Sequence, residues 1–379
     1  MLSDLAQLLD PVSPETFHKE YLGRRPLHIP ATGNAAKRTV LDWAAFNALI
    51  GQTANWTANS LRLMVNGVAV PPSEYCEVAR TPNGEVLRPS PPKVERHLNL
   101  GASVVVNEVQ TLHPPIAAAA TMLGRSFAAQ VGANVYSSFQ DIQAFPTHYD
   151  VHDVFAVQAE GTKLWRIYST QSDVPVELPP DTPETRQWLT QSRGQLVQEV
   201  LMQPGDVLYL PRGRFHDALA TDGASLHVTF SVTALHGSSV LSLLENAAKQ
   251  FPVFREYLPV AHQDDGRALS QHLSKLSAFL AELMASPAFR DEIAMAQERL
   301  VLRHKTYALP LRTESPVYRM TGKALAPVST PVMIALDWCR TQESFSLDQV
   351  IAEFDFVNPD LLKQAIQAAE ESGAITRIG

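Results

Sequence analysis

The fold is decided by the stretch Phe155-Ala156-Val157-Gln158-Ala159-Glu160-Gly161-Thr162-Lys163-Leu164-Trp165-Arg166-Ile167-Tyr168, which is two short β-type runs joined by a turn. Similar runs, separated by Gly and Pro, continue from about Gly132 to Leu235. They are Asn134 to Phe139, Gln198 to Gln203, Asp206 to Leu210 and Ser225 to Val232. The turns Glu160-Gly161-Thr162 and Gln203-Pro204-Gly205-Asp206 predict hairpins between four of the strands. Many short antiparallel strands favour a sandwich or a barrel.

The sequence on either side of this β-rich block is largely helical in pattern. Before it come an amphipathic start, an extended segment and one predicted helix, at Leu2 to Leu9, Arg25 to Ile29 and Leu41 to Ile50. After His236, apolar residues at spacings of three and four predict helices around Ser239 to Gln250 and Leu269 to Arg303. The apolar face of the second segment, which includes Leu273, Leu276, Phe279, Leu280 and Leu283, is expected to be buried.

The C-terminal segment predicts a small unit of its own. An extended entry at Pro316 to Met320 precedes three helices and a closing strand. These are expected at Pro331 to Arg340, Ser346 to Phe354, Asn358 to Ser372 and Ala374 to Ile378. This order of helices and strand resembles a winged helix.

The composition sets limits on the class of protein. The chain has 379 residues, of which 45% are hydrophobic, so that it can bury a large core in two or three structural units. Its formal charge of −8 gives no overall attraction to nucleic acid or anionic lipid. Its two cysteines, Cys76 and Cys339, are far apart and are expected to be reduced. The N-terminal residues lack a signal-peptide pattern, and we expect a cytoplasmic protein.

Two histidines and an aspartate form a candidate metal site. His148 and Asp150 are spaced i and i+2, so that both point to one side of an extended segment. His216 follows a turn at Pro211-Arg212-Gly213, and the mouth of a small barrel can bring it beside the first pair. Two imidazoles and one carboxylate can occupy one face of an octahedral metal and leave the opposite face open, as non-haem Fe(II) oxygenases require. Without a thiolate the set is a poor structural zinc site. A His-x-Asp triplet can also arise by chance. The turn at Pro211-Arg212-Gly213 and the His216 that follows it make chance a weaker explanation here.

The order and spacing of several fragments resemble the JmjC-type ribosomal oxygenases, a family of 2-oxoglutarate-dependent protein hydroxylases in the cupin superfamily. The fragments are His148-Tyr149-Asp150, Phe155-Ala156-Val157-Gln158, Gly161-Thr162-Lys163, Trp165-Arg166-Ile167-Tyr168, Pro204-Gly205-Asp206, Tyr209-Leu210-Pro211, His216, Ser225-Leu226-His227-Val228-Thr229, and, near the N-terminus, Phe17, Tyr21 and Arg24-Arg25-Pro26-Leu27. The resemblance implies a double-stranded β-helix, the jelly roll of the cupin and JmjC folds. It implies a catalytic domain with an N-terminal extension over residues 1–236, a helical dimerisation region over 237–310 and a winged helix over 311–379.

The resemblance also implies cofactors and ligand residues. Fe(II) is held by His148, Asp150 and His216, and Lys163 holds the distal carboxylate of 2-oxoglutarate, with O2 as a further cosubstrate. A buried dicarboxylate needs a cation at its far end, which agrees with a lysine in this role. Taken alone, Lys163 also fits a solvated lysine after a tight turn.

Four further residues are candidates for binding the cosubstrate or the substrate. Asn134 and Tyr136 alternate with Val135 on a predicted strand, so that both side chains face the same way; a polar strand face in water is the alternative. Ser225 and His227 share one strand face in the same manner. His227 equally fits a hydrogen-bonded core histidine.

The expected substrate is a protein. Relatives in this family hydroxylate an arginine or histidine of a ribosomal protein, and the acidic balance of the chain favours a basic partner. A homodimer is expected, with no membrane partner. The third helix of the C-terminal unit carries Asp360, Lys363, Glu370 and Glu371 and lacks a basic face, so nucleic-acid binding is not expected.

Two other functions remain open from the sequence. One is a metal cupin that does not use 2-oxoglutarate, in which Lys163 is incidental. The other is a winged-helix regulator of nucleic acid that uses the barrel as a sensor.

Overall fold

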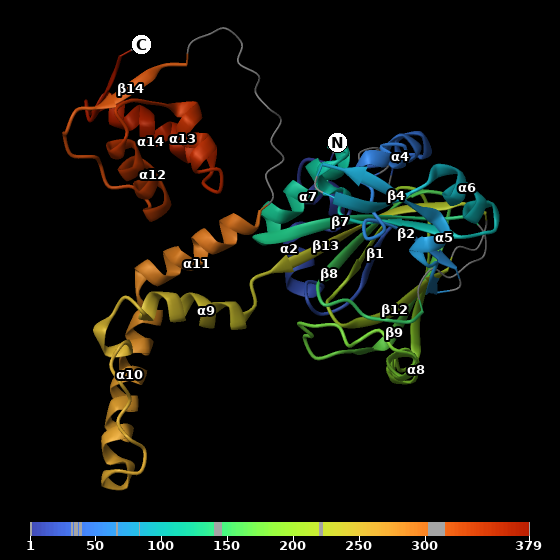
Figure 1. Cartoon of the computed structure of the whole chain (residues 1–379), viewed down its shortest axis with the longest axis horizontal. Coiled ribbons are helices and arrows are strands. Elements are labelled where there is room, and N and C mark those ends of the chain that lie inside the picture. The colour runs from blue at the N-terminus through green and yellow to red at the C-terminus, as the bar shows by residue number, and fades with distance from the viewer. Residues whose placement is uncertain are drawn as a thin grey trace. The chain divides into compact units, whose positions relative to one another are not determined.

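The computed structural model describes residues 2–31, 33, 37, 40–65, 67–82, 84–139, 146–219, 223–301 and 315–378. Its contacts divide the chain into two compact units, Met1–Thr233 and Ala234–Gly379 (Figure 1). The predicted boundary at residues 310 and 311 and the end of the predicted helix at Arg303 lie outside the described residues.

The first unit is built on two β-sheets. The larger has eight strands in the order β1-β11-β8-β13-β7-β6-β2-β3, and the smaller has the order β10-β9-β12. The strands are β1 (Leu27–Ile29), β2 (Leu61–Val65), β3 (Val68–Ala69), β6 (Ser103–Val106), β7 (Ala129–Ser138), β8 (Asp153–Glu160), β9 (Lys163–Gln171), β10 (Leu196–Met202), β11 (Val207–Leu210), β12 (Arg214–Leu219) and β13 (Ser225–Ala234). The runs predicted between Gly132 and Leu235 are therefore confirmed as strands, within a few residues at their ends.

Alternation along the strands creates two cores in this unit. Phe155, Val157 and Ala159 of β8 enter a large cluster on the outer face of the eight-stranded sheet. Val154 and Ala156 point the other way and pack between the two sheets. The inter-sheet cluster is completed by Trp165, Ile167, Val200, Met202, Leu208, Leu210 and the half-buried Ala218. The two sheets thus pack face to face, as in a β-sandwich or jelly roll.

The predicted hairpins at Glu160-Gly161-Thr162 and Gln203-Pro204-Gly205-Asp206 are wrong. β8 pairs with β11 and β13, whereas β9 pairs with β10 and β12, so the first turn passes from one sheet to the other. The second turn likewise leads from β10 in the small sheet to β11 in the large one. Gly and Pro show where a strand ends, but the partner of the next strand is chosen by packing between distant segments.

Helices cover the outer face of the large sheet. They include α1 (Leu5–Leu9), α2 (Pro14–Glu20), α4 (Trp43–Ile50), α5 (Pro72–Tyr75), α6 (Pro91–Asn99) and α7 (Pro114–Phe127), accompanied by a hairpin of β4 (Cys76–Thr81) and β5 (Gly84–Pro89) and by the short helices η1 (Thr53–Asn55) and η2 (Val109–Thr111). The leucines of the amphipathic start are buried in α1 and next to it, as predicted. The extended segment before Ile29 pairs with β11, where the His28 ring lies 2.9 Å from an Asp206 carboxylate oxygen.

The second unit begins with helices α9 (Gly237–Ala248), α10 (Arg267–Ala285) and α11 (Pro287–Leu300), and with the short helices η3 (Pro252–Phe254) and η4 (Asp264–Gly266). The segment predicted as helical over Leu269 to Arg303 is interrupted at Ser286, whose side chain caps α11 ahead of Pro287. The expected burial of its apolar face is not found, because α10 has no buried residue and Leu273 is 49% exposed. Phe251 and Phe254 contact Phe279.

The C-terminal part of the second unit packs three helices on a three-stranded sheet of order β15-β14-β16. Its elements are β14 (Val317–Met320), α12 (Thr330–Thr341), β15 (Phe345–Ser346), α13 (Leu347–Glu353), α14 (Pro359–Glu371) and β16 (Ile375–Arg377), and they confirm the predicted order. Across the described chain, no helix is both long and apolar enough to cross a membrane.

Candidate metal centre

The three predicted ligands meet at one point of the first unit. His216 lies on β12, and His148 lies opposite it on the extended segment 146–150. The two histidines exchange both backbone hydrogen bonds, with N to O distances of 3.0 and 2.9 Å. Gly213 donates its backbone N–H to the Asp150 carbonyl at 2.8 Å. One possible ligand atom from each of His148, Asp150 and His216 lies within 4.8 Å of the others.

Both imidazoles are oriented by the same kind of contact. Nδ1 of His148 lies 2.9 Å from the Pro146 carbonyl, and Nδ1 of His216 lies 2.9 Å from the Arg214 carbonyl. A carbonyl can only accept, so Nδ1 carries the proton and the lone pair is left on Nε2. Contacts of this type fix the ring and the tautomer of histidines that bind metals. Trp165 stacks against the His216 ring with a centroid distance of 5.8 Å.

The electrostatics of the site favour a cation. Burial, followed by the charge of His148, lowers the pKa of His216 to about 4, so that this imidazole is neutral at physiological pH. Burial by itself would raise the pKa of Asp150, but the neighbouring His148, His216 and His152 bring it below its usual value. A neutral imidazole and an ionised carboxylate are the states that bind a divalent metal.

The donor set fits an ion such as Fe(II). Two nitrogens and one oxygen suit Fe(II), Mn(II) or Co(II), and a three-residue set leaves coordination positions for other ligands. Among the residues that the structure describes, no fourth His, Cys, Asp or Glu joins the group. Both thiols, Cys76 and Cys339, are buried elsewhere.

A small cavity of about 90 Å³ lies against the three ligands and reaches Lys163. Lys163 is 2% exposed, and among the described residues its Nζ makes one hydrogen bond, a long one to Ser138 Oγ at 3.5 Å. Burial lowers its pKa to about 8. A solvated lysine, the alternative considered from the sequence, is therefore wrong. A buried ammonium with so little compensation calls for an anionic ligand.

Three of the four other candidates line this cavity. Asn134 and Tyr136 both face it from β7, and His227 faces it from β13. The His227 ring stacks on Tyr136 at 4.9 Å, and burial, followed by the charge of Lys163, keeps its pKa well below the usual value. Burial and then Asp150 raise the pKa of Tyr136 to about 12.

Ser225 is placed differently. Its hydroxyl accepts a hydrogen bond from Gln158 Nε2 at 2.9 Å, and it is not among the residues that line the cavity. Gln158 also donates to the Glu160 carbonyl at 2.9 Å. Ser225 thus supports the turn that precedes Lys163.

Sequence reasoning missed several residues of the cavity wall, namely His152, Val154, Trp165, Ala218, Thr229 and Ser231. Period-two alternation provides a signal for all six, since counting in twos from Asp150 reaches His152 and Val154. Counting in twos from Lys163 reaches Trp165, from His216 reaches Ala218, and from His227 reaches Thr229 and Ser231.

Two larger cavities adjoin the small one. One of about 330 Å³ shares Tyr136, His148 and Asp150 with it and extends to Arg62 and to α8 (Pro183–Ser192). The other, of about 630 Å³, shares Asn134 and Ser231 with it and has a polar wall of amide and hydroxyl side chains. The candidate metal site therefore borders space wide enough for a substrate side chain.

A β-sandwich with an open-faced His-Asp-His site defines a cupin-like metal protein. Residues 109–240 match the family model of the JmjC domain. The chain is 30% identical to "Bifunctional lysine-specific demethylase and histidyl-hydroxylase NO66" of Dictyostelium discoideum, over 67% of this chain and 49% of that protein. It is 28% identical to the Drosophila persimilis protein of the same name, over 64% and 33%. The chain thus spans between a third and a half of the length of these relatives.

The fold also matches solved structures. The crystal structure of the Escherichia coli ribosomal oxygenase YcfD superposes with a TM-score of 0.52 at 16% identity, covering 97% of this chain and 98% of that one. A structure of YcfD in complex with cobalt and 2-oxoglutarate gives a TM-score of 0.51 at 18% identity, covering 97% and 99%. Residues 109–240 are thus similar to the JmjC domain, and the chain shares the fold of YcfD.

Proposed function

We propose that this chain is an Fe(II)- and 2-oxoglutarate-dependent dioxygenase that hydroxylates a side chain of a protein. His148, Asp150 and His216 would hold the metal, and Lys163 would bind the distal carboxylate of 2-oxoglutarate. The observation that carries the proposal is the buried Lys163 ammonium, which lines the same small cavity as the three ligands. A metal cupin that does not use 2-oxoglutarate has no need of this cation.

When bound, Fe(II) and 2-oxoglutarate supply the oxidising chemistry, in which O2 is consumed, 2-oxoglutarate becomes succinate and CO2, and a C–H bond of the substrate becomes C–OH. The residues of this chain bind and orient. Asn134, Tyr136 and His227 would form the wall against which cosubstrate and substrate are placed, and Ser225 would act indirectly through Gln158.

For the substrate, we propose an arginine or histidine of a ribosomal protein. The names of the relatives support this, since YcfD is titled a ribosomal oxygenase and NO66 a histidyl-hydroxylase and lysine-specific demethylase. The formal charge of −8 favours encounter with a basic protein. We also propose a cytoplasmic location.

For the organisation of the chain, we propose a JmjC catalytic domain over residues 1–236, a dimerisation region over 237–310 and a winged helix over 311–379. The exposed apolar residues of the second unit support a homodimer; they include Leu241, Leu258, Leu273 and Met284. In α14, Lys363 pairs with Asp360 at 3.2 Å and is not left free for a phosphate. We therefore propose a partner-docking or structural role for the winged helix.

The test has two parts. Titration of 2-oxoglutarate into the metal-loaded protein should show binding, and incubation with Fe(II), ascorbate and O2 should yield succinate. Failure of 2-oxoglutarate to bind the loaded protein would favour the cupin alternative. Comparison of ribosomal proteins from cells with and without this chain should reveal a gain of one oxygen mass on a single protein. A duplex-binding assay across salt concentrations would show a steep slope only for a nucleic-acid regulator.

A further inference from the structure

The two histidine ligands have a second pair of residues directly behind them. His148 and His216 form an isolated antiparallel bridge, so the next residues along each segment, Thr147 and Asp217, also lie opposite each other. Side chains alternate between the two sides of an extended chain, so Thr147 and Asp217 project away from the ligands. On the other flank of the bridge, Tyr149 lies opposite Phe215, with ring centroids 5.1 Å apart.

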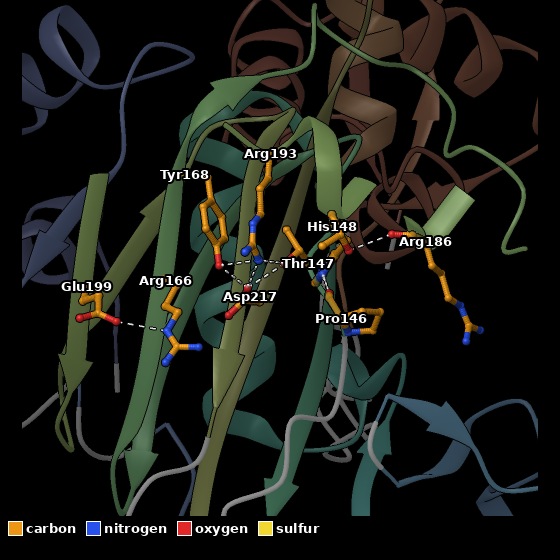
Figure 2. Close-up of polar contacts among 10 residues, drawn as sticks. Pro146, Thr147, His148, Arg166, Tyr168, Arg186, Arg193, Glu199 and Asp217 are labelled. Atoms are coloured by element: carbon orange, nitrogen blue, oxygen red, sulfur yellow. Dashed lines mark hydrogen bonds and ion pairs between the residues drawn. The ribbon is translucent and has the colours of Figure 1, made fainter. Parts of the chain in front are cut away.

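Asp217 is the centre of a buried cluster on this side (Figure 2). Its Oδ2 accepts hydrogen bonds from Thr147 Oγ1 at 2.8 Å and from Tyr168 OH at 2.7 Å. Arg193 Nη1 donates to Thr147 Oγ1 and to Tyr168 OH, each at 3.0 Å, and lies 3.8 Å from Asp217 Oδ2. The guanidinium stacks over the Tyr168 ring, 4.4 Å from its centroid. These side chains come from the segment before β8, from β9, from the end of α8 and from β12, and Figure 2 shows them converging on Asp217.

Stability alone is a weak reason for such a cluster. Asp217 is 3% exposed, and its other carboxylate oxygen, Oδ1, is buried and has no hydrogen-bond partner within the described part of the chain. A buried carboxylate loses its hydration, and an unsatisfied oxygen adds to that cost. Apolar residues of the same size would stabilise this position at least as well. Apolar residues would not hold the two ligand-bearing segments in one fixed orientation, because they lack directional hydrogen bonds.

The Asp217 cluster adds to the backbone contacts that hold the segment before β8 against β12. His148 is held to β12 by one bridge and not by a continuous strand. The Asp217 cluster joins this segment to β12, to Tyr168 on β9 and to Arg193 at the end of α8. It therefore adds side-chain restraints to the two backbone hydrogen bonds that join His148 to His216.

We propose that Asp217 is a positioning residue of the metal centre, which acts through the Thr147 and Tyr168 hydroxyls to hold the His148 and His216 rings at the spacing required by one ion. This inference rests on the proposed function of the three ligands. Asp217, Thr147 and Tyr168 are not metal ligands. They act on metal affinity and on coordination geometry, and not merely on the stability of the fold.

The experiment measures Co(II) binding by the full-length protein, through the visible absorption of the bound ion and by competition with a chelator. Thr147→Val and Tyr168→Phe each remove one hydroxyl with little change of shape. Each should weaken Co(II) binding about 10- to 100-fold, as loss of a group that orients ligands does. Thr147→Ser keeps the hydroxyl and should restore the affinity of the natural protein.

Tyr75→Phe is the matched control. Tyr75 is also buried, and its hydroxyl donates to the Leu61 carbonyl at 3.2 Å, away from the candidate metal centre. This variant should lose stability to denaturant much as Tyr168→Phe does, while its Co(II) affinity and absorption spectrum stay unchanged. If Thr147→Val does not fold, Tyr168→Phe still tests the inference.

Three results would overturn the inference. Thr147→Val and Tyr168→Phe could bind Co(II) with natural affinity and spectrum, Thr147→Ser could weaken binding as much as Thr147→Val, or Tyr75→Phe could weaken it as much as Tyr168→Phe. Failure of the natural protein itself to bind Co(II) would instead overturn the proposed function, and this inference with it.

Discussion

Lys163 is a cation in an unusual place, since its side chain is buried and its pKa is lowered to about 8 by that burial. Burial, followed by the charge of Lys163, lowers the pKa of His227, so that this imidazole stays neutral. Among the described residues that line the small cavity, Lys163 is the one Lys or Arg side chain, and it is buried. A dicarboxylate that reaches both this charge and the metal would be held at its two ends.

The roles of His216 and Lys163 should separate on mutation. His216→Ala should abolish retention of the metal, because it removes a ligand. Lys163→Ala should leave metal affinity almost unchanged and raise the KM for 2-oxoglutarate about 10- to 100-fold, the effect of losing a charge-assisted hydrogen bond. Metal content by mass spectrometry and steady-state kinetics measure the two effects. Equal loss of metal in both variants would show that the roles are assigned wrongly.

Binding of 2-oxoglutarate should depend on pH through Lys163. Its pKa in the folded protein lies below that of a free lysine, so the ligand-free protein loses this proton as the pH rises through about 8. Affinity for the dicarboxylate should therefore be constant below that pH and fall about tenfold per pH unit above it. Calorimetric titration between about pH 7 and pH 9 measures the slope. Lys163→Arg keeps its charge and should show no such fall, so an equal slope in this variant would point to another group.

The turn between β8 and β9 helps to place a candidate site residue. The turn at Gly161 passes from the large sheet to the small one and places Lys163 at the start of β9. Gly161 has a φ of +62°, and a Cβ at this position would lie 1.9 Å from the Ala224 carbonyl oxygen. Glycine is required here by the close approach of another segment as well as by its own backbone.

Gly161→Ala should therefore destabilise the protein. The left-handed backbone and the clash together should lower the free energy of unfolding by about 2 kcal/mol or more. Gly23→Ala is the control, because Gly23 has a φ of +68° with nothing within 4 Å of the added Cβ. The Gly23→Ala substitution should lower the free energy of unfolding by only about 1 kcal/mol. If denaturant titrations show the same loss of unfolding free energy in both variants, the close approach of Ala224 does not explain the need for glycine at position 161.

The boundaries of most elements could be predicted from local pattern. β-type runs located β7 to β11 and β13, apolar spacings of three and four located α9, and helix start and stop signals located α12 and α14, within a few residues. Two expectations failed for physical reasons. The turns at Gly161 and Gly205 were taken for hairpins, because turn residues specify a reversal of the chain and not the partner of the next strand. The break at Ser286 was missed, although Ser-Pro is a helix-start signal.

At the scale of the whole molecule, the apolar face of α10 needs a partner. This 19-residue helix has no buried residue, and Leu273 and Met284 are about half exposed. A second copy of the chain is the partner that we propose. Such a face on a lone protein in water would favour aggregation.

Leu273→Glu should convert the dimer into a monomer, because it places a charge in the apolar interface. Gln271→Glu, which adds the same charge to an exposed position of the same helix, should leave the dimer intact. Sedimentation or light scattering gives the mass, and circular dichroism shows whether both variants stay folded. A natural protein that is monomeric, or a Leu273→Glu variant that stays dimeric, would contradict the proposed interface.

By itself, the sequence determined the β-rich block with its helical flanks and the choice of the three candidate ligands, because these depend on local periodicity and on the chemistry of His and Asp. Only the tertiary structure decided which strands pair across the two sheets, that Lys163 is buried, and that Asp217 lies behind the ligands beside Thr147 and Tyr168. Burial and side-chain contacts depend on segments far apart in the chain. No local pattern reports which of those segments will meet.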